Sequence, residues 1–171
     1  MKVKRLMQMS LLTAIALTIF LVEARIPTLA PIPGMKLGLA NIVTTWALFT
    51  LGPAEAVMIL LGRILLGSLF SGSMMSLLYS LSGGLLCFLL SLLLRKLVST
   101  KQIWVVSILG AMAHNIGQLL VATAVMQTWT VWYYAPVLMI SGMLAGAFTG
   151  TAAQTLFFRF KGLHVFGREK T

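Results

Sequence analysis

Few residues of this chain can do chemistry, and several of them lie inside long apolar runs. Only 9% of the 171 residues are charged, and three of those are acidic. Arg63 lies within an apolar run, where an ionisable side chain is costly and by default marks a function. A guanidinium there could grip a phosphate or carboxylate of a ligand in a bidentate manner. The alternative is a structural ion pair with Glu23 or Glu55, of which Glu23 is the better placed.

A second polar group interrupts the apolar run near residue 115. His114 and Gln118 are four residues apart, and Asn115 and Gln118 are three apart, so all three are predicted to share one helical face. In lipid these groups must find hydrogen-bond partners within the protein. They could bond to neighbouring helices or form the polar wall of a ligand cavity. Metal binding is disfavoured, because no second histidine or carboxylate lies nearby in sequence.

A third group stands before the next apolar run, where Lys36, Gly38 and Asn41 follow one another closely. A glycine at position 38 would let the backbone approach a ligand or another helix. Asn41 could contact the same ligand or bond to a neighbouring helix. The aromatic residues Trp132 and Tyr133 are added to these candidate ligand-binding residues, because they are predicted to lie at the same membrane surface.

The residues also exclude several functions. The chain has no phosphate-binding glycine loop, so it is not itself a nucleotide-driven motor. It contains no aspartate, which excludes the acidic clusters that bind diphosphate and magnesium in prenyl synthases. No nucleophile arrangement stands out. We therefore expect no catalytic residue, no metal and no cofactor, and we expect the protein not to be an enzyme.

The elements that position these residues follow from composition. Hydrophobic residues make up 59% of the chain, and a soluble domain of this size could not bury so much apolar surface. The fold class expected is an all-α integral membrane protein, a six-transmembrane-helix bundle forming one domain over residues 1–171. The six spans are predicted at about residues 5–24, 36–51, 53–70, 74–94, 103–126 and 136–158.

The basic residues predict the orientation of these spans. The net charge is +10, but the cations stand in short blocks between apolar runs, a pattern typical of membrane topology and not of nucleic-acid binding. With the N-terminus inside, the predicted cytoplasmic side holds ten of the 13 Lys and Arg residues, and the outer side holds only Arg25 and Lys36. Both termini are therefore predicted to be cytoplasmic, in the cell membrane. Asn41, Arg63 and Gln118 then fall in the outer half, as an outward-facing site for an external small molecule.

Small residues recur at four-residue spacing on two of the spans. Such stripes let helices pack closely in lipid, where leucine offers no advantage over a lipid tail. One stripe on the last span comprises Gly142, Gly146 and Gly150, and a stripe on the first span comprises Ser10, Ala14 and Thr18. Either could pack inside the bundle or dock a separate membrane subunit. We assign the glycines to helix packing and the stripe on the first span to partner docking.

Two motifs resemble those of a known family. The stretches Pro33–Val43 (PGMKLGLANIV) and Gly110–Leu119 (GAMAHNIGQL) are similar to those of the Gx transporter family, also labelled heptaprenyl diphosphate synthase component I. More distantly, the layout resembles the S components of energy-coupling factor transporters. That resemblance implies capture of a vitamin-like ligand from outside, docking on a membrane T component through the first span, and energy from cytoplasmic ATPases.

The leading hypothesis is an S-component-like transport protein that captures a small organic anion, vitamin-like or related to a redox cofactor, from the extracellular side. Its partners would be the ligand, the lipid bilayer and a T component with its ATPases. One alternative is a non-catalytic membrane accessory of prenyl diphosphate or quinone synthesis. Another is a structural subunit of a flavin-based electron-transfer system.

Overall fold

The computed structural model describes residues 2–25 and 36–161, and within these ranges the chain forms helices and no strand. Gly34, the proline-rich segment around it and the basic residues Arg168 and Lys170 lie outside the described residues. The helices are α1 (Lys2–Glu23), α2 (Asn41–Thr50), α3 (Pro53–Ser71), α4 (Met74–Leu94), η1 (Thr100–Gln102), α5 (Ile103–Met126), η2 (Trp129–Tyr134) and α6 (Ala135–Lys161).

Local sequence explains where the long helices begin and end. Pro53 occupies the first turn of α3, where its missing amide hydrogen costs nothing. The same helix ends at Gly72, whose φ of 60° is the left-handed conformation that glycine adopts most easily. Ser73 then caps α4 by accepting a hydrogen bond from the Ser76 amide. Short turns therefore fold α3 and α4 back against each other.

Five helices, α1, α3, α4, α5 and α6, are long and apolar enough to cross a membrane. The count of six spans is not confirmed, because the expected span over residues 36–51 is helical only over Asn41–Thr50. Ten helical residues rise about 15 Å, roughly half of a bilayer's hydrocarbon thickness. Residues 36–38 are not helical, and Gly38 has a φ of 83° that an α-helix cannot contain.

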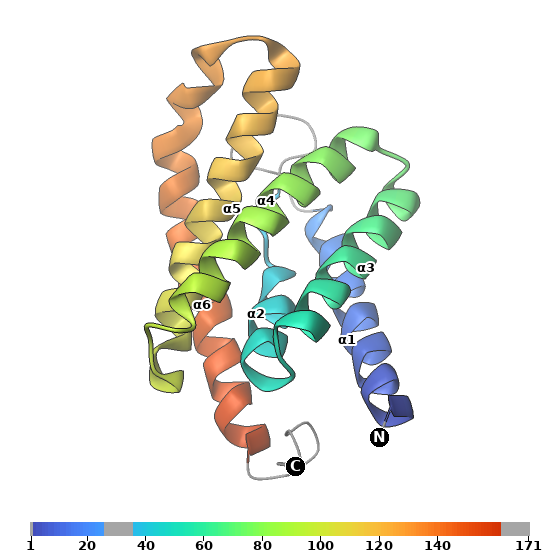
Figure 1. The fold of residues 1–171 in the computed structure, drawn as a ribbon. Helices are drawn as coiled ribbons and strands as arrows, with labels where there is room; N and C mark the ends of the chain where they lie inside the picture. Colours follow the sequence, from blue (N-terminus) through green and yellow to red (C-terminus); the bar gives the residue numbers. More distant parts are fainter. Residues whose placement is uncertain (1, 26–35, 162–171) are drawn as a thin grey trace.

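The long helices surround the short one (Figure 1). α1 packs beside α3, α4 packs beside α5, and α5 packs beside α6, while α2 touches α1, α3, α4, α5 and α6. The start of α1, the end of α4 and the end of α6 lie at the same end of the bundle (Figure 1). These ends carry basic residues, including Lys4, Arg95 and Arg159, so the basic blocks gather at one end.

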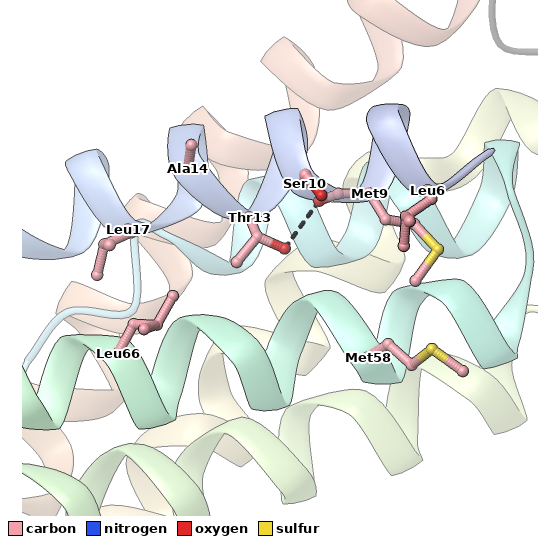
Figure 2. A pocket seen from close by; sticks show the side chains of 8 residues that line it. All are labelled: Leu6, Met9, Ser10, Thr13, Ala14, Leu17, Met58 and Leu66. Atoms are coloured by element: carbon pink, nitrogen blue, oxygen red, sulfur yellow. Dashed lines mark hydrogen bonds between the residues drawn. The ribbon is translucent and has the colours of Figure 1, made fainter. Parts of the chain in front are cut away.

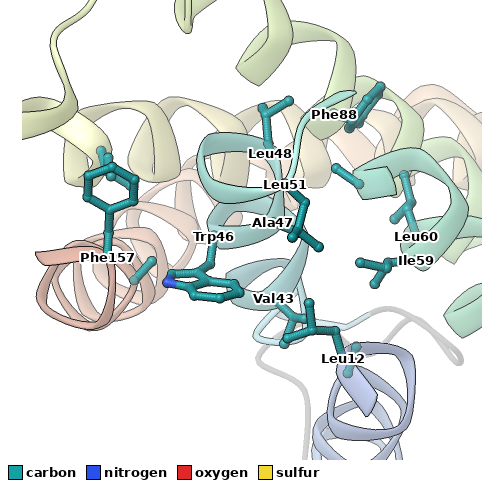
Figure 3. Close-up of a cluster of buried hydrophobic side chains, with 14 of the residues drawn as sticks. Leu12, Val43, Trp46, Ala47, Leu48, Leu51, Ile59, Leu60, Phe88 and Phe157 are labelled. Carbon is teal, nitrogen blue, oxygen red and sulfur yellow. The ribbon is translucent and has the colours of Figure 1, made fainter. Parts of the chain in front are cut away.

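An apolar core surrounds α2 (Figure 3). Val43, Ala47 and Leu48 of α2 are buried against Ile59 and other residues of α3 and α4. On another side of α2, Trp46 meets Phe160 of α6 edge-to-face, with the ring centroids 6.3 Å apart. The short helix is thus covered by protein on several sides.

The three glycines of α6 lie against α5. A Cβ at Gly142 would come within 2.5 Å of Asn115 Nδ2, and one at Gly146 or Gly150 would come within 2.7 or 2.6 Å of an α5 Cα atom. The backbones therefore approach too closely for any side chain between them. A hydrogen bond of 3.0 Å between Ser107 and Thr149 crosses the same interface.

Candidate ligand site around Arg63 and the start of α2

Arg63 is buried in α3, with 3% of its surface exposed. Its Nη2 donates to Asn41 Oδ1 at the start of α2, over 2.9 Å. This contact joins two of the predicted site residues. Among the described residues, Arg63 forms no ion pair with Glu23 or Glu55; the ion pair found there joins Arg5 to Glu55 over 3.6 Å. Glu23 nevertheless lies within electrostatic reach of Arg63.

The non-helical segment that leads into α2, residues 36–40, is held by side chains from two other helices. Glu23 of α1 accepts hydrogen bonds from the Gly38 amide over 2.5 Å and from the Ala40 amide over 3.4 Å. Gln118 of α5 accepts from the Lys36 amide over 3.2 Å and donates to the Lys36 carbonyl over 3.0 Å. These bonds replace those that a helix would supply, so a non-helical backbone can lie inside the bundle.

The side chain of Lys36 points inward and is half-buried. Its Nζ donates to Ser76 Oγ of α4 over 3.0 Å and lies 3.2 Å from the centre of the Phe20 ring of α1. The carboxylate of Glu23 and the guanidinium of Arg63 both lie within electrostatic reach of this ammonium group. Lys36 therefore faces the protein interior and brings a second positive charge close to Arg63.

His114 and Gln118 form the α5 side of the site. His114 Nε2 and Gln118 Nε2 are 2.6 Å apart, within hydrogen-bond distance. Gly38 packs directly on the His114 ring, since a Cβ there would come within 2.9 Å of His114 Cδ2. The glycine thus permits the close approach expected at this position, and what it approaches in the structure is His114.

Asn115 points away from His114 and Gln118. Its Nδ2 donates to the Leu138 carbonyl of α6 over 2.5 Å. The prediction that His114, Asn115 and Gln118 share one helical face is therefore wrong for Asn115. On a helix, residue 115 is displaced from residue 114 by about 100°, so Asn115 joins the α5–α6 interface while its neighbour faces the segment before α2.

The aromatic candidates lie apart from this cluster. Trp132 Nε1 donates to Thr123 Oγ1 over 2.9 Å. Thr123 follows Gln118 on α5, nearer to the C-terminal end of that helix. Tyr133 is 84% exposed. Neither side chain makes a described contact with Lys36, Asn41 or Arg63. The structure therefore brings together five of the eight predicted ligand-binding residues, namely Lys36, Asn41, Arg63, His114 and Gln118.

Two buried donors of the Arg63–Asn41 pair, Arg63 Nε and Asn41 Nδ2, lack an acceptor within the part of the chain that the structure describes. His114 Nδ1 of the same site also lacks a partner there. Buried polar groups are nearly always paired in folded proteins, and each unpaired one calls for an explanation. The arrangement can therefore bind an acceptor such as a carboxylate.

Sequence reasoning missed two contributors. Glu23 was considered only as an ion-pair partner, whereas it accepts bonds from the backbone before α2. Ser76 gave no signal, because a serine within an apolar helix is common and usually bonds to its own helix. One sequence signal for the role of Glu23 was available. It lies at the end of the first predicted span, and the glycine-containing segment begins at the same predicted membrane surface.

The small residues of α1 lie away from this site. Ser10, Ala14 and Thr18 are all exposed. Ser10 and Ala14 line a largely apolar groove of about 350 Å³ between α1 and α3, together with Met58 and Leu66 of α3 (Figure 2). Part of the predicted docking stripe thus lines a shallow surface groove and is not buried against another helix of the described chain.

Comparison with known proteins identifies one family. The family described as heptaprenyl diphosphate synthase component I matches residues 12–156. The matched range includes α2 to α5 and the whole Arg63–Asn41–Gln118 region. No curated protein and no solved structure matches the chain.

Proposed function

The chain belongs to the heptaprenyl diphosphate synthase component I family, and we propose that it is a membrane substrate-binding protein, similar to an S component, that captures a small organic anion from outside the cell. The ligand would be vitamin-like or related to a redox cofactor. In this proposal residues 1–171 form one transmembrane domain, and a membrane T component with cytoplasmic ATPases supplies the energy.

The observation that carries this proposal is the pair of unsatisfied donors beside two cations. Arg63 Nε and Asn41 Nδ2 are buried without an acceptor among the described residues, and Lys36 lies within electrostatic reach of Arg63. The start of α2 is at the same place, and the N-terminus of a helix favours negative charge. A carboxylate bound here would satisfy both donors and offset a buried positive charge.

The proposed topology places this site in the outer half of the membrane. The basic ends of α1, α4 and α6 lie at one end of the bundle, which the positive-inside rule assigns to the cytoplasm. Residues 36–40 and α2 would together make the second of six crossings. Broken crossings of this kind form ion and substrate sites in transporters, because their free backbone groups and helix ends lie at membrane depth.

The exposed stripe on α1 supports docking of a partner through that helix. Ser10, Ala14 and Thr18 would offer a smooth surface for close approach of another helix. No other helix of the described chain covers these three residues, since all are exposed. In the proposed assembly the T component would cover them.

The experiment that tests the function measures ligand retention. The protein is purified in lipid nanodiscs, and co-purifying small molecules are identified by mass spectrometry. Arg63→Met, which removes the buried charge and keeps side-chain length, is expected to reduce retention of the compound at least tenfold. Arg5→Met is the matched control, because Arg5 pairs with Glu55 outside the site, and it is expected to retain the ligand. Equal retention in both variants would rule out the site.

The family description favours a second candidate, a membrane accessory of prenyl diphosphate synthesis. Its wording names a component, which implies that another subunit accompanies it. The chain has no aspartate, so the acidic metal-binding chemistry would have to reside in that other subunit. This candidate expects the purified chain to raise product chain length when added to a soluble prenyl transferase. A reconstituted assay without such stimulation would eliminate it.

A further inference from the structure

The charges of the site do not balance. Arg63 and Lys36 are cations, and Glu23 is the acid within electrostatic reach of both. The other titratable side chains close to Arg63 are His114 and Cys87, which carry no formal negative charge. With Arg63 and Lys36 positive and Glu23 negative, the described part of the site has a formal net charge of +1.

Glu23 is committed to the protein. Both of its carboxylate oxygens accept backbone N–H groups of the segment before α2, and such bonds favour the ionised form of a carboxylate. Arg63 turns its Nη2 to Asn41 Oδ1, a neutral acceptor, instead. Glu23 therefore offsets one of the two positive charges by proximity, and the second is left uncompensated at a buried position, where it is costly.

We infer that Glu23 sets the charge of the ligand, so that the site takes a compound with a single carboxylate and discriminates against dianions. This inference rests on the proposed capture of an anion and specifies its chemical class. A monoanion brings the formal charge of the site to zero. A dicarboxylate or phosphate monoester would leave an excess negative charge next to Glu23, which is again a buried uncompensated charge.

The donors that remain free fit one carboxylate. Arg63 Nε and Asn41 Nδ2 come from neighbouring helices and are the unsatisfied donors of the Arg63–Asn41 pair within the described chain. Two donors match the two oxygens of a carboxylate. Lys36 Nζ is already engaged by Ser76 and the Phe20 ring, so it contributes charge and not a free hydrogen bond.

The test uses matched probes that differ in charge. Pairs such as benzoate and phthalate, or hexanoate and adipate, are added to the full chain in nanodiscs, and thermal unfolding midpoints give apparent dissociation constants. In the wild-type protein, monocarboxylates are expected to bind at least tenfold more tightly than their dicarboxylate partners. Glu23→Gln raises the formal charge of the site to +2 and is expected to reverse this preference. Glu55→Gln, an equivalent change beyond the site, is expected to preserve it.

Each outcome has a distinct meaning. If dicarboxylates bind wild-type protein as tightly as monocarboxylates do, the charge assignment of Glu23 is wrong while the anion site stands. An unchanged preference in Glu23→Gln also overturns the assignment. If no anion of the panel raises the unfolding midpoint, the anion site itself fails, and the proposed function fails with it. Glu23→Gln keeps one oxygen acceptor for these two backbone amides and Glu23→Ala keeps none, so comparison of the two variants separates loss of charge from loss of structure.

Discussion

The α5–α6 and α1–α3 helix pairs use small residues in opposite ways. Gly142, Gly146 and Gly150 of α6 let its backbone approach α5 so closely that a single added carbon would overlap it. Ser10 and Ala14 of α1 border a groove of about 350 Å³ and remain exposed. The same four-residue spacing therefore builds the bundle in one place and leaves an open surface in the other.

The difference shows what a small-residue stripe needs before it becomes an internal interface. Across α5–α6, the stripe faces a partner that also offers small or polar groups: Ser107 bonds to Thr149, and Asn115 bonds to the Leu138 carbonyl. Across α1–α3, the opposing residues at the groove are the long side chains of Met58 and Leu66. The close contacts of this pair are made elsewhere, where Gly62 and Gly67 of α3 meet the Thr13 and Phe20 side chains of α1, so Ser10 and Ala14 remain on the surface.

The largest expected effect comes from filling the close-packed interface. Gly146→Leu places a side chain where a Cβ already meets Ile108 Cα at 2.7 Å. Because backbone must move to accommodate it, we expect a loss of about 3 kcal/mol in the free energy of unfolding. Denaturation in mixed micelles, followed by circular dichroism, measures this. A loss below about 0.5 kcal/mol would mean that the two helices are not in this contact.

An intermediate effect is expected on partner binding, without loss of stability, from the open stripe. Ala14→Leu enlarges an exposed side chain of α1 at the edge of the groove and should change the unfolding free energy by less than about 0.5 kcal/mol. If α1 docks a separate subunit, the same change should reduce co-purification of that subunit severalfold. Leu11→Ala, on an exposed position beside the stripe, serves as the control. Strong destabilisation by Ala14→Leu would contradict the view that the α1 stripe is an open surface while the α6 stripe is an internal interface.

The smallest expected effect concerns the hydrogen bond that crosses α5–α6. Thr149→Val removes the hydroxyl that meets Ser107 at 3.0 Å and keeps the shape of the side chain. A double-mutant cycle with Ser107→Ala should give a coupling of about 0.6 kcal/mol, the average for such bonds in membrane proteins. A coupling near zero would assign the stability of this interface to glycine packing alone.

The long helices could be predicted from the sequence because each bears one dominant signal. A run of about 20 apolar residues bounded by charges or turn residues is helical in lipid for lack of any other way to pair its backbone. The bounds of α4 and α5, Met74–Leu94 and Ile103–Met126, coincide with the predicted ranges. The second predicted span, residues 36–51, is helical only over Asn41–Thr50, because hydropathy does not register where a run of apolar residues stops being helical.

The sequence indicated which residues form the site better than it indicated which of them contact one another. Arg63, Asn41, His114 and Gln118 were recognisable because polar residues in an apolar run are costly. The pairing of Arg63 with Asn41 could not be predicted, because the partner of a buried arginine depends on which side chain lies within reach and not on charge alone. The outward turn of Asn115 and the separation of Trp132 and Tyr133 from the cluster likewise depend on helix rotation and depth, to which the pattern of residue types is insensitive.

The sequence by itself determined that this protein is a bundle of apolar helices with its basic residues gathered between them, because the transfer of apolar side chains and charges between water and lipid depends mainly on residue type. Only the tertiary structure decided that residues 36–40 leave the helix and are held by Glu23 and Gln118. The reason is that these bonds join residues up to 82 positions apart. Their formation depends on where three helices meet.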